Sequence, residues 1–229
     1  MKVLVATDGS KYGRWAIEWA AKLPLTVKPV LRVLHVVDLA SLRAPFMIQP
    51  VMVGTERYIQ QEVKRMEAAA KSAKTESKEL LSSLGVSGTV TLERGAVAAT
   101  ITKHASRGVG LLALGSRGLD ALDRFMLGSI STHAIHHAAC SVLVVKESPR
   151  PLGQVVLAID GSAASDKAFR FLLRNVNPQP NGPDEQPVNV AVVHVMPFLK
   201  YPEVRETGKA IVQRYADKLA KAGFQVQEA

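Results

Sequence analysis

The chain has 229 residues, of which 47% are hydrophobic and 21% are charged, so it can form one large or two small globular domains with a buried core. Its single cysteine, Cys140, excludes an internal disulfide framework, and no apolar run approaches the roughly 18 residues that a spanning helix needs. The first residues also lack the pattern of a secretory leader. We therefore expect a cytoplasmic protein with no membrane partner.

The net charge of +9 lies mostly in residues 1–150, which carry 20 Lys and Arg against 12 Asp and Glu. These charges are interspersed, without a basic helix, a zinc pattern or an aromatic-basic RNA motif, so we expect no nucleic-acid partner. A local basic excess of this size also suits a polyphosphate ligand.

Residues 1–146 alternate apolar runs with helical patterns. The expected strands are 2–7, 29–37, 87–93, 109–115 and 141–145, and the expected helices are 11–22, 55–84, 96–105 and 129–138. Runs such as "KVLVAT" and "SVLVVK" are almost continuously apolar, which indicates strands covered on both faces of a parallel sheet. The pattern predicts a doubly wound, Rossmann-like α/β domain. Such sheets bind ligands beyond the carboxyl ends of their strands.

The chain also contains an internal repeat. "KVLVATDGSKYGRWAIEWA" at 2–20 and "QVVLAIDGSAASDKAFRFL" at 154–172 both read as strand, Asp-Gly-Ser and helix. We predict a complete domain at 1–147, a Pro/Gly linker at 148–153, and a partial second copy at 154–229 that lacks the last strands. The first strand of this copy then has an exposed edge, which either a longer chain or another surface must cover.

The stretch "GSRGLDALDRFMLGSIS" at 115–131 is the main candidate site. Gly115 and Gly118 would let the backbone approach a ligand or adopt positive φ. Gly128 and Ser129 then begin a helix, whose unpaired N–H groups can bind phosphate. In the alternative interpretation, the glycines only shape a turn and Ser129 only caps the helix. If the loop binds a nucleotide, a bulky residue at Gly115 or Gly118 should abolish binding and leave the fold intact.

Two further charged positions belong to this hypothesis. Asp8 follows the first strand and could accept hydrogen bonds from a ribose or a base, although it could equally form a turn in which Asp8 or Ser10 caps the next helix. Arg117 lies inside the glycine loop and could contact a phosphate. Arg124 is a weaker candidate, because two aspartates close by in sequence favour a local ion pair.

The strand "VLVATDGS", the strand "LHVVD" and the glycine spacing of the loop resemble the universal stress proteins, specifically their tandem type. The resemblance implies five parallel strands in the order 3-2-1-4-5 and binding of ATP with Mg²⁺. The positions that match nucleotide-binding residues of that family are Thr7, Asp8, Val37, Gly115, Arg117, Gly118, Gly128, Ser129 and Ile130. Since the loop occurs once, we expect one nucleotide per chain.

The resemblance predicts an ATP-binding stress protein whose association or partner binding depends on nucleotide. It also implies a homodimer that pairs through the edge strand 141–145. We expect no catalytic residues, and at most slow ATP hydrolysis or autophosphorylation. The alternative is an interaction or dimerisation module of the stress response that binds no nucleotide.

The remaining motifs carry weaker predictions. His133, His136 and His137 have helical spacing that suits either a metal or a solvated helix face, and we expect no metal. His35 and His194 occupy matching strand positions, where we expect hydrogen-bonded structural histidines. The apolar segment at 39–54 could be a lid over the nucleotide or a partner surface.

Overall fold

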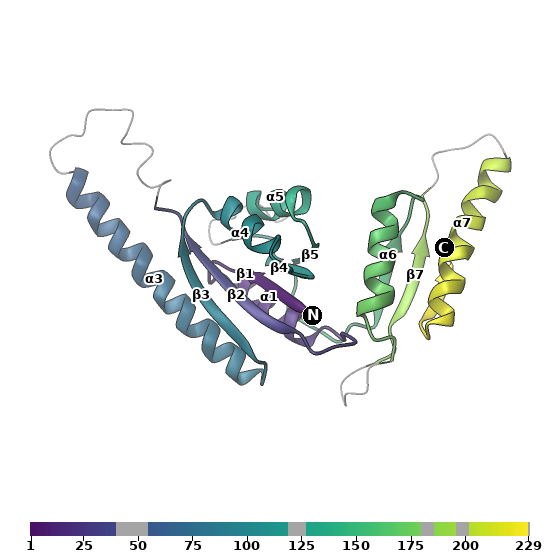
Figure 1. The fold of residues 1–229 in the computed structure, drawn as a ribbon, viewed down its shortest axis with the longest axis horizontal. Helices are drawn as coiled ribbons and strands as arrows, with labels where there is room; N and C mark the ends of the chain where they lie inside the picture. The colour runs from purple at the N-terminus through teal and green to yellow at the C-terminus, as the bar shows by residue number, and fades with distance from the viewer. Residues whose placement is uncertain (40–54, 119–126, 180–185, 196–201, 229) are drawn as a thin grey trace. The chain divides into compact units, whose positions relative to one another are not determined.

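Figure 1 shows the computed structural model, which describes residues 1–39, 55–118, 127–179, 186–195 and 202–228. The chain folds into two compact units. The first unit contains Met1–Lys22 and Pro29–Pro149, and the second contains Leu23–Lys28 and Arg150–Ala229. Within the described residues, no helix is both long enough and apolar enough to cross a membrane.

The first unit is built on a five-stranded parallel sheet. Its strands are β1 (Lys2–Ala6), β2 (Val30–Val37), β3 (Gly88–Arg94), β4 (Leu111–Gly115) and β5 (Ser141–Val145). They lie in the order β3-β2-β1-β4-β5, and each neighbouring pair is parallel. The expected fold class and strand order are confirmed, and the strand ends differ from the expected ones by one or two residues at most.

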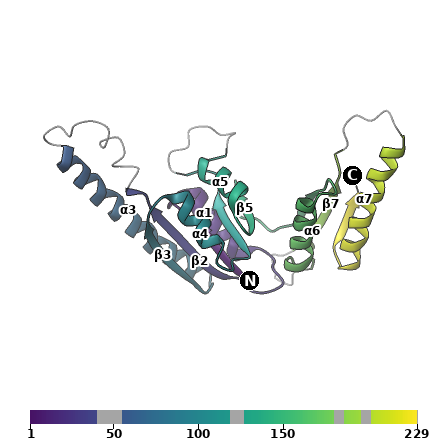
Figure 2. The same cartoon turned by 45° about the horizontal axis from the view of Figure 1, so that its top comes forward.

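Helices cover both faces of this sheet. They are α1 (Lys11–Lys22), α3 (Thr55–Ser83), α4 (Val97–Ala105) and α5 (Ser129–His137). Helices α1 and α3 contact each other on one face, and α4 and α5 contact each other on the opposite face (Figure 2). Because both faces are covered, every residue of β1 after Lys2 is buried, which explains its continuous apolar run.

Local signals set the ends of the long helices. The Ser10 side chain accepts a hydrogen bond from the Gly13 amide at 3.2 Å and so caps the start of α1. Helix α3 ends at Ser83, and Gly85 just beyond it has φ of 63°, after which the Val86 amide donates to the Leu81 carbonyl. This left-handed glycine is the usual way to end a helix.

The second unit has one three-stranded parallel sheet in the order β6-β7-β8. Its elements are β6 (Gln154–Ala158), α6 (Ala163–Asn175), β7 (Asn189–Val193), α7 (Pro202–Lys221) and β8 (Gln225–Glu228). Phe169 of α6 and Tyr215 of α7 pack edge to face at 4.9 Å between ring centroids. Both belong to a single core that also contains Leu157, Val190 and Val192 of the strands. Helices α6 and α7 therefore lie on the same face.

One short segment differs from the expected domain bounds. Leu23–Lys28, between α1 and β2, belongs to the second unit because Leu25 forms an antiparallel bridge with Val176. The Thr26 amide donates to the Asn175 carbonyl at 2.9 Å, and its hydroxyl donates to the Arg174 carbonyl at 3.2 Å. These donors satisfy carbonyl groups at the C-terminal end of α6, which lack intrahelical partners.

Candidate functional site

The carboxyl ends of β1 and β4 bring Asp8 and Gly118 together. A Cβ atom placed on Gly118 would lie 2.7 Å from Oδ2 of Asp8, so the carboxylate occupies the space that any larger residue would fill. Asp8 is exposed at this edge of the sheet. Two residues that sequence reasoning assigned to one site are therefore in direct proximity.

A hydrogen-bonded turn fixes the Asp8 carboxylate. Its Oδ1 accepts from the Ser10 amide at 3.0 Å, and the Thr7 hydroxyl accepts from the Gly9 amide at 3.1 Å. Gly9 has φ of 86°, which a residue with a Cβ rarely adopts. The turn interpretation is thus confirmed with Ser10 as the cap, and it still leaves Oδ2 directed at Gly118.

The second unit contains the same turn, and none of its described residues forms a glycine loop opposite it. The Ser162 amide donates to Oδ1 of Asp160 at 2.9 Å, and Gly161 has φ of 79°. Hydrogen bonds from the side chain and backbone of Ser162 lower the pKa of Asp160 to about 2. Asp160 is therefore a carboxylate at neutral pH, in a turn that matches that of Asp8.

The two ends of the glycine loop are held by backbone and hydroxyl contacts. The Gly128 amide donates to the Ser116 carbonyl at 2.8 Å, and the Ser131 hydroxyl donates to the Gly115 carbonyl at 2.8 Å. The Ser116 amide in turn donates to the Val145 carbonyl at 2.7 Å. These bonds place the start of α5 beside the end of β4.

Helix α5 begins at Ser129, with Gly128 as its N-cap residue. No side chain among the described residues caps this end, and the first amides of a helix have no intrahelical acceptor. Ser129 and Ile130 therefore present backbone N–H groups at the positive end of the helix dipole. The N–H of Gly128 itself is engaged by Ser116, so it shapes the loop.

The backbone conformations of the loop glycines differ from part of our expectation. Positive φ is absent at Gly115, Gly118 and Gly128. A Cβ on Gly115 would lie 2.6 Å from Cβ and 2.8 Å from the carbonyl carbon of Tyr12, so this glycine permits close packing of β4 against α1. This packing argues against the expectation that a bulky residue at Gly115 leaves the fold intact, and we predict instead that such a residue destabilises the first unit.

Arg117 lies next to α1, with its guanidinium carbon 5.8 Å from the centre of the Tyr12 ring. Residues 119–126, which include Arg124, lie outside the described residues, as do residues 40–54 of the expected lid. The loop thus contributes its two ends, with Arg117 and Gly118 at one and Ser129 and Ile130 at the other.

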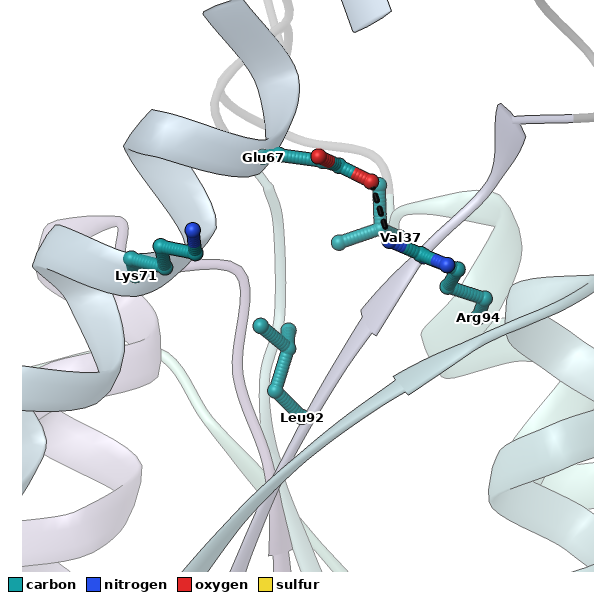
Figure 3. A pocket seen from close by; sticks show the side chains of 5 residues that line it. All are labelled: Val37, Glu67, Lys71, Leu92 and Arg94. Carbon is teal, nitrogen blue, oxygen red and sulfur yellow. Dashed lines mark hydrogen bonds and ion pairs between the residues drawn. The ribbon is translucent and has the colours of Figure 1, made fainter. Parts of the chain in front are cut away.

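Val37 marks a pocket of about 430 Å³ between α3 and the ends of β2 and β3 (Figure 3). Its lining residues are Val37, Glu67, Lys71, Leu92 and Arg94. The Val37 carbonyl accepts from the Gly95 amide at 3.1 Å, so the Val37 side chain, 7% exposed, is the group that faces the pocket.

Three charged pocket residues were missed by sequence reasoning. Glu67 and Lys71 project from α3, and Glu67 forms an ion pair with Arg94 at the end of β3 (Figure 3). The available signals were the helical spacing of Glu67 and Lys71 and the position of Arg94 at the carboxyl end of a strand. Neither signal links α3 to β3 without the fold.

His35 in β2 and His194 just after β7 are hydrogen-bonded structural histidines, as expected. His35 is 3% exposed and its Nε2 lies 3.0 Å from the Ser77 hydroxyl, while Nδ1 of His194 lies 2.7 Å from the Ile159 carbonyl oxygen. Burial lowers the pKa of His35, and the negative charge of Asp8 partly opposes that shift. Within the part of the chain that the structure describes, no cluster of three or more His, Cys, Asp or Glu could hold a metal.

The fold and this edge define a doubly wound α/β domain with its candidate site at the carboxyl ends of β1 and β4. The sequence model of the universal stress protein family matches residues 1–146. The chain therefore belongs to the universal stress protein family.

Individual relatives agree with this membership. A putative universal stress protein of Staphylococcus epidermidis is 30% identical over 152 residues, which cover 65% of this chain and 86% of the relative. A universal stress protein of Mycobacterium tuberculosis is 33% identical over 178 residues, covering 72% of this chain but only 56% of the relative. This chain thus matches just over half the length of the mycobacterial protein.

A solved structure extends the likeness in fold to the second unit. The crystal structure of a universal stress protein from Archaeoglobus fulgidus aligns with 99% of this chain and 76% of its own, with a TM-score of 0.63 and 17% identity. At that identity the comparison concerns the fold alone.

Proposed function

We propose that the first unit binds ATP, accompanied by Mg²⁺, at the carboxyl edge between Asp8 and the glycine loop. The observation that carries this proposal is the proximity of the Asp8 carboxylate to Gly118, since it places a fixed acceptor beside the loop. Family membership supports the same ligand, because the loop has the spacing found in nucleotide-binding universal stress proteins.

The phosphates would lie at the start of α5. The amides of Ser129 and Ile130 have no intrahelical acceptor and no side-chain cap within the described residues. Arg117, at the opposite end of the loop, would add a charge-assisted contact. Two groups of donors would therefore hold one polyphosphate chain.

The nucleoside would lie toward β1 and β2. A carboxylate accepts hydrogen bonds from ribose hydroxyls, and the turn at Asp8 already holds this side chain in place. The buried apolar side chain of Val37 would border the base, with Thr7 between the two strand ends. The glycine spacing of the loop occurs once in the sequence, beside Asp8, so we propose one nucleotide per chain.

Magnesium would enter with the phosphates. Protein-bound Mg²⁺ commonly takes one or two carboxylates together with phosphate oxygens and water. The side chain of Asp8 would be one such ligand. Among the described residues, no cluster of three or more His, Cys, Asp or Glu side chains could hold the ion without the phosphates. When bound, Mg²⁺ would neutralise phosphate charge.

The role would be binding rather than rapid turnover. His35 is buried and bonded to Ser77, so it is withdrawn from the edge where phosphates would lie. We further propose that nucleotide occupancy alters association through β5, an edge strand of the first sheet. An unpaired apolar edge favours pairing with another strand.

Calorimetric titration of the full chain with Mg-ATP, adenosine and triphosphate tests the proposal. We expect Mg-ATP to bind more tightly than either fragment, because both halves of the site then contribute. Light scattering with and without Mg-ATP should show a dimer whose population changes with nucleotide. Absence of binding up to millimolar ATP would favour the interaction module instead, and a strict monomer at all micromolar concentrations would contradict pairing through β5.

A further inference from the structure

Among the described residues of the second unit, α6 and α7 cover one face of the sheet. Leu157, Val190 and Val192 are at most 5% exposed and pack against α6 and α7. Successive side chains of a strand point to opposite faces. Val156, between two inward residues of β6, is 65% exposed, and Val195 just beyond β7 is 81% exposed.

The first unit shows how the equivalent face is covered. Lys2 pairs with Val30 at the start of β1, and Gln154 pairs with Asn189 at the start of β6. When these two pairs are aligned, Leu4 corresponds to Val156. Leu4 is only 2% exposed, and it shares a core with Ile101 of α4 and other apolar residues of β4 and α5. The same apolar position is thus buried in one unit and exposed in the other.

Three further positions repeat this relationship. By the same register, Ala6, Leu34 and Val36 of the first unit correspond to Ala158, Val193 and Val195. The first three belong to or pack on the core under α4, whereas Ala158 and Val195 are exposed and Val193 is only partly buried. The side chains of the second unit are apolar and similar in size to their counterparts in the first. This exposed surface therefore has the composition of a buried one.

The edge of β6 is also open. In the first unit β1 pairs with β2 on one side and with β4 on the other. Among the described strands, only β7 pairs with β6, which lies at the end of its sheet. An unpaired edge strand presents free backbone donors and acceptors.

We propose that this surface, defined by the β6 edge with Val156, Ala158, Val193 and Val195, binds a strand-and-helix polypeptide segment of the type that 97–145 forms in the first unit. The strand would add in parallel to β6, as β4 adds to β1. A helix with apolar residues, like Ile101 and Ala105 of α4, would cover the face. The inference is independent of nucleotide binding.

A second copy of the chain would cover this surface less completely. Pairing of two β6 edges would leave the apolar face exposed, and packing of two faces would leave both edges open. Three strands of about five residues present a face of roughly 230 Å². A stable interface usually buries about 800 Å² of accessible surface on each partner, so an occupant of this face has to cover the strand edge as well. A strand with a helix covers the edge and the face together.

Binding can be measured with the polypeptide 97–147 of this chain as a labelled probe. We expect fluorescence anisotropy to show saturable binding to the full chain, and hydrogen exchange to show new protection of β6 amides. Val156→Lys should weaken binding at least tenfold. Val27→Lys, at a 62% exposed valine of the same unit outside the sheet, should bind as the unaltered chain does. Both positions are exposed, so neither change should alter the fold.

A single chain that carries 97–147 after Ala229 on a Gly/Ser linker provides a second measurement if the free probe is insoluble. Protection of β6 amides in that chain, lost with Val156→Lys, supports the proposal. It is overturned if neither format protects β6, or if Val156→Lys binds the probe normally. A full-chain dimer that Val156→Lys dissociates, without probe binding, would identify a second copy as the occupant and also overturn it.

Discussion

The carboxylate of Asp8 lies against Gly118, with Oδ2 2.7 Å from the position that a Cβ would take. Asp8 lies in the turn just after the first strand and Gly118 in the loop just after the fourth, so the parallel sheet brings them together. This relationship connects the turn that begins α1 to the loop that precedes α5.

Gly118→Ala should displace the Asp8 carboxylate without disturbing the backbone around it. We expect Mg-ATP affinity to fall about tenfold, because a hydrogen bond to a charged group contributes about 1.5–3 kcal/mol. Gly153→Ala is the matched control, since its Cβ would likewise displace only the end of a side chain, that of Gln186 in the second unit. Equal affinity of the two variants would argue against a role for the contact between Asp8 and Gly118.

Gly115→Val should destabilise the first unit itself. The added side chain would collide with Tyr12, including its backbone, and overpacking of this kind costs about 1–3 kcal/mol. Urea unfolding followed by circular dichroism would measure the loss. A variant as stable as the original chain would show that β4 and α1 can separate at little cost.

Ser10→Ala and Ser162→Ala should each remove a helix cap, in the first and second unit respectively. Each hydroxyl accepts an amide hydrogen bond at 3.2 Å, from Gly13 and Ser165. Loss of such a cap typically costs about 1 kcal/mol. Hydrogen exchange should show increased opening of α1 in one variant and of α6 in the other. Identical exchange in both helices would contradict independent caps.

Stability should fall with decreasing pH because of His35. Burial lowers its pKa in the folded state, so the unfolded chain takes up the proton first as pH drops below about 6.5. The free energy of unfolding should then decrease by at most about 1.4 kcal/mol per pH unit. Urea unfolding at pH 7.5 and 5.5 measures this slope. His35→Gln should reduce it, whereas His136→Gln, at an exposed position, should retain it.

Much of the fold follows from local patterns. Helix 11–22 was predicted at its observed bounds because Ser10 caps it and apolar residues recur with helical spacing. The five strands were predictable because both faces of the sheet are covered, which gives continuous apolar runs. Leu23–Lys28 was not assigned to the second unit, since its pairing with Val176 joins segments far apart in sequence.

The candidate site was only partly predictable. The glycine spacing identified the loop, but the reason for Gly115 is its contact with Tyr12, which no local pattern reveals. The pocket residues Glu67 and Arg94 come from a helix and a strand whose proximity depends on the tertiary fold. These features of the site depend on contacts between segments far apart in the sequence, which residue spacing does not reveal.

The most direct test of the ATP-binding proposal is a calorimetric titration of the full chain with Mg-ATP, repeated for Asp8→Ala and Asp160→Ala. Both substitutions remove an aspartate from the same kind of hydrogen-bonded turn, and Asp8 lies beside Gly118 of the glycine loop in its own unit. We predict one nucleotide per chain, an affinity at least tenfold weaker for Asp8→Ala, and no change for Asp160→Ala. Two sites per chain, no binding, or equal effects of the two substitutions would contradict the proposal.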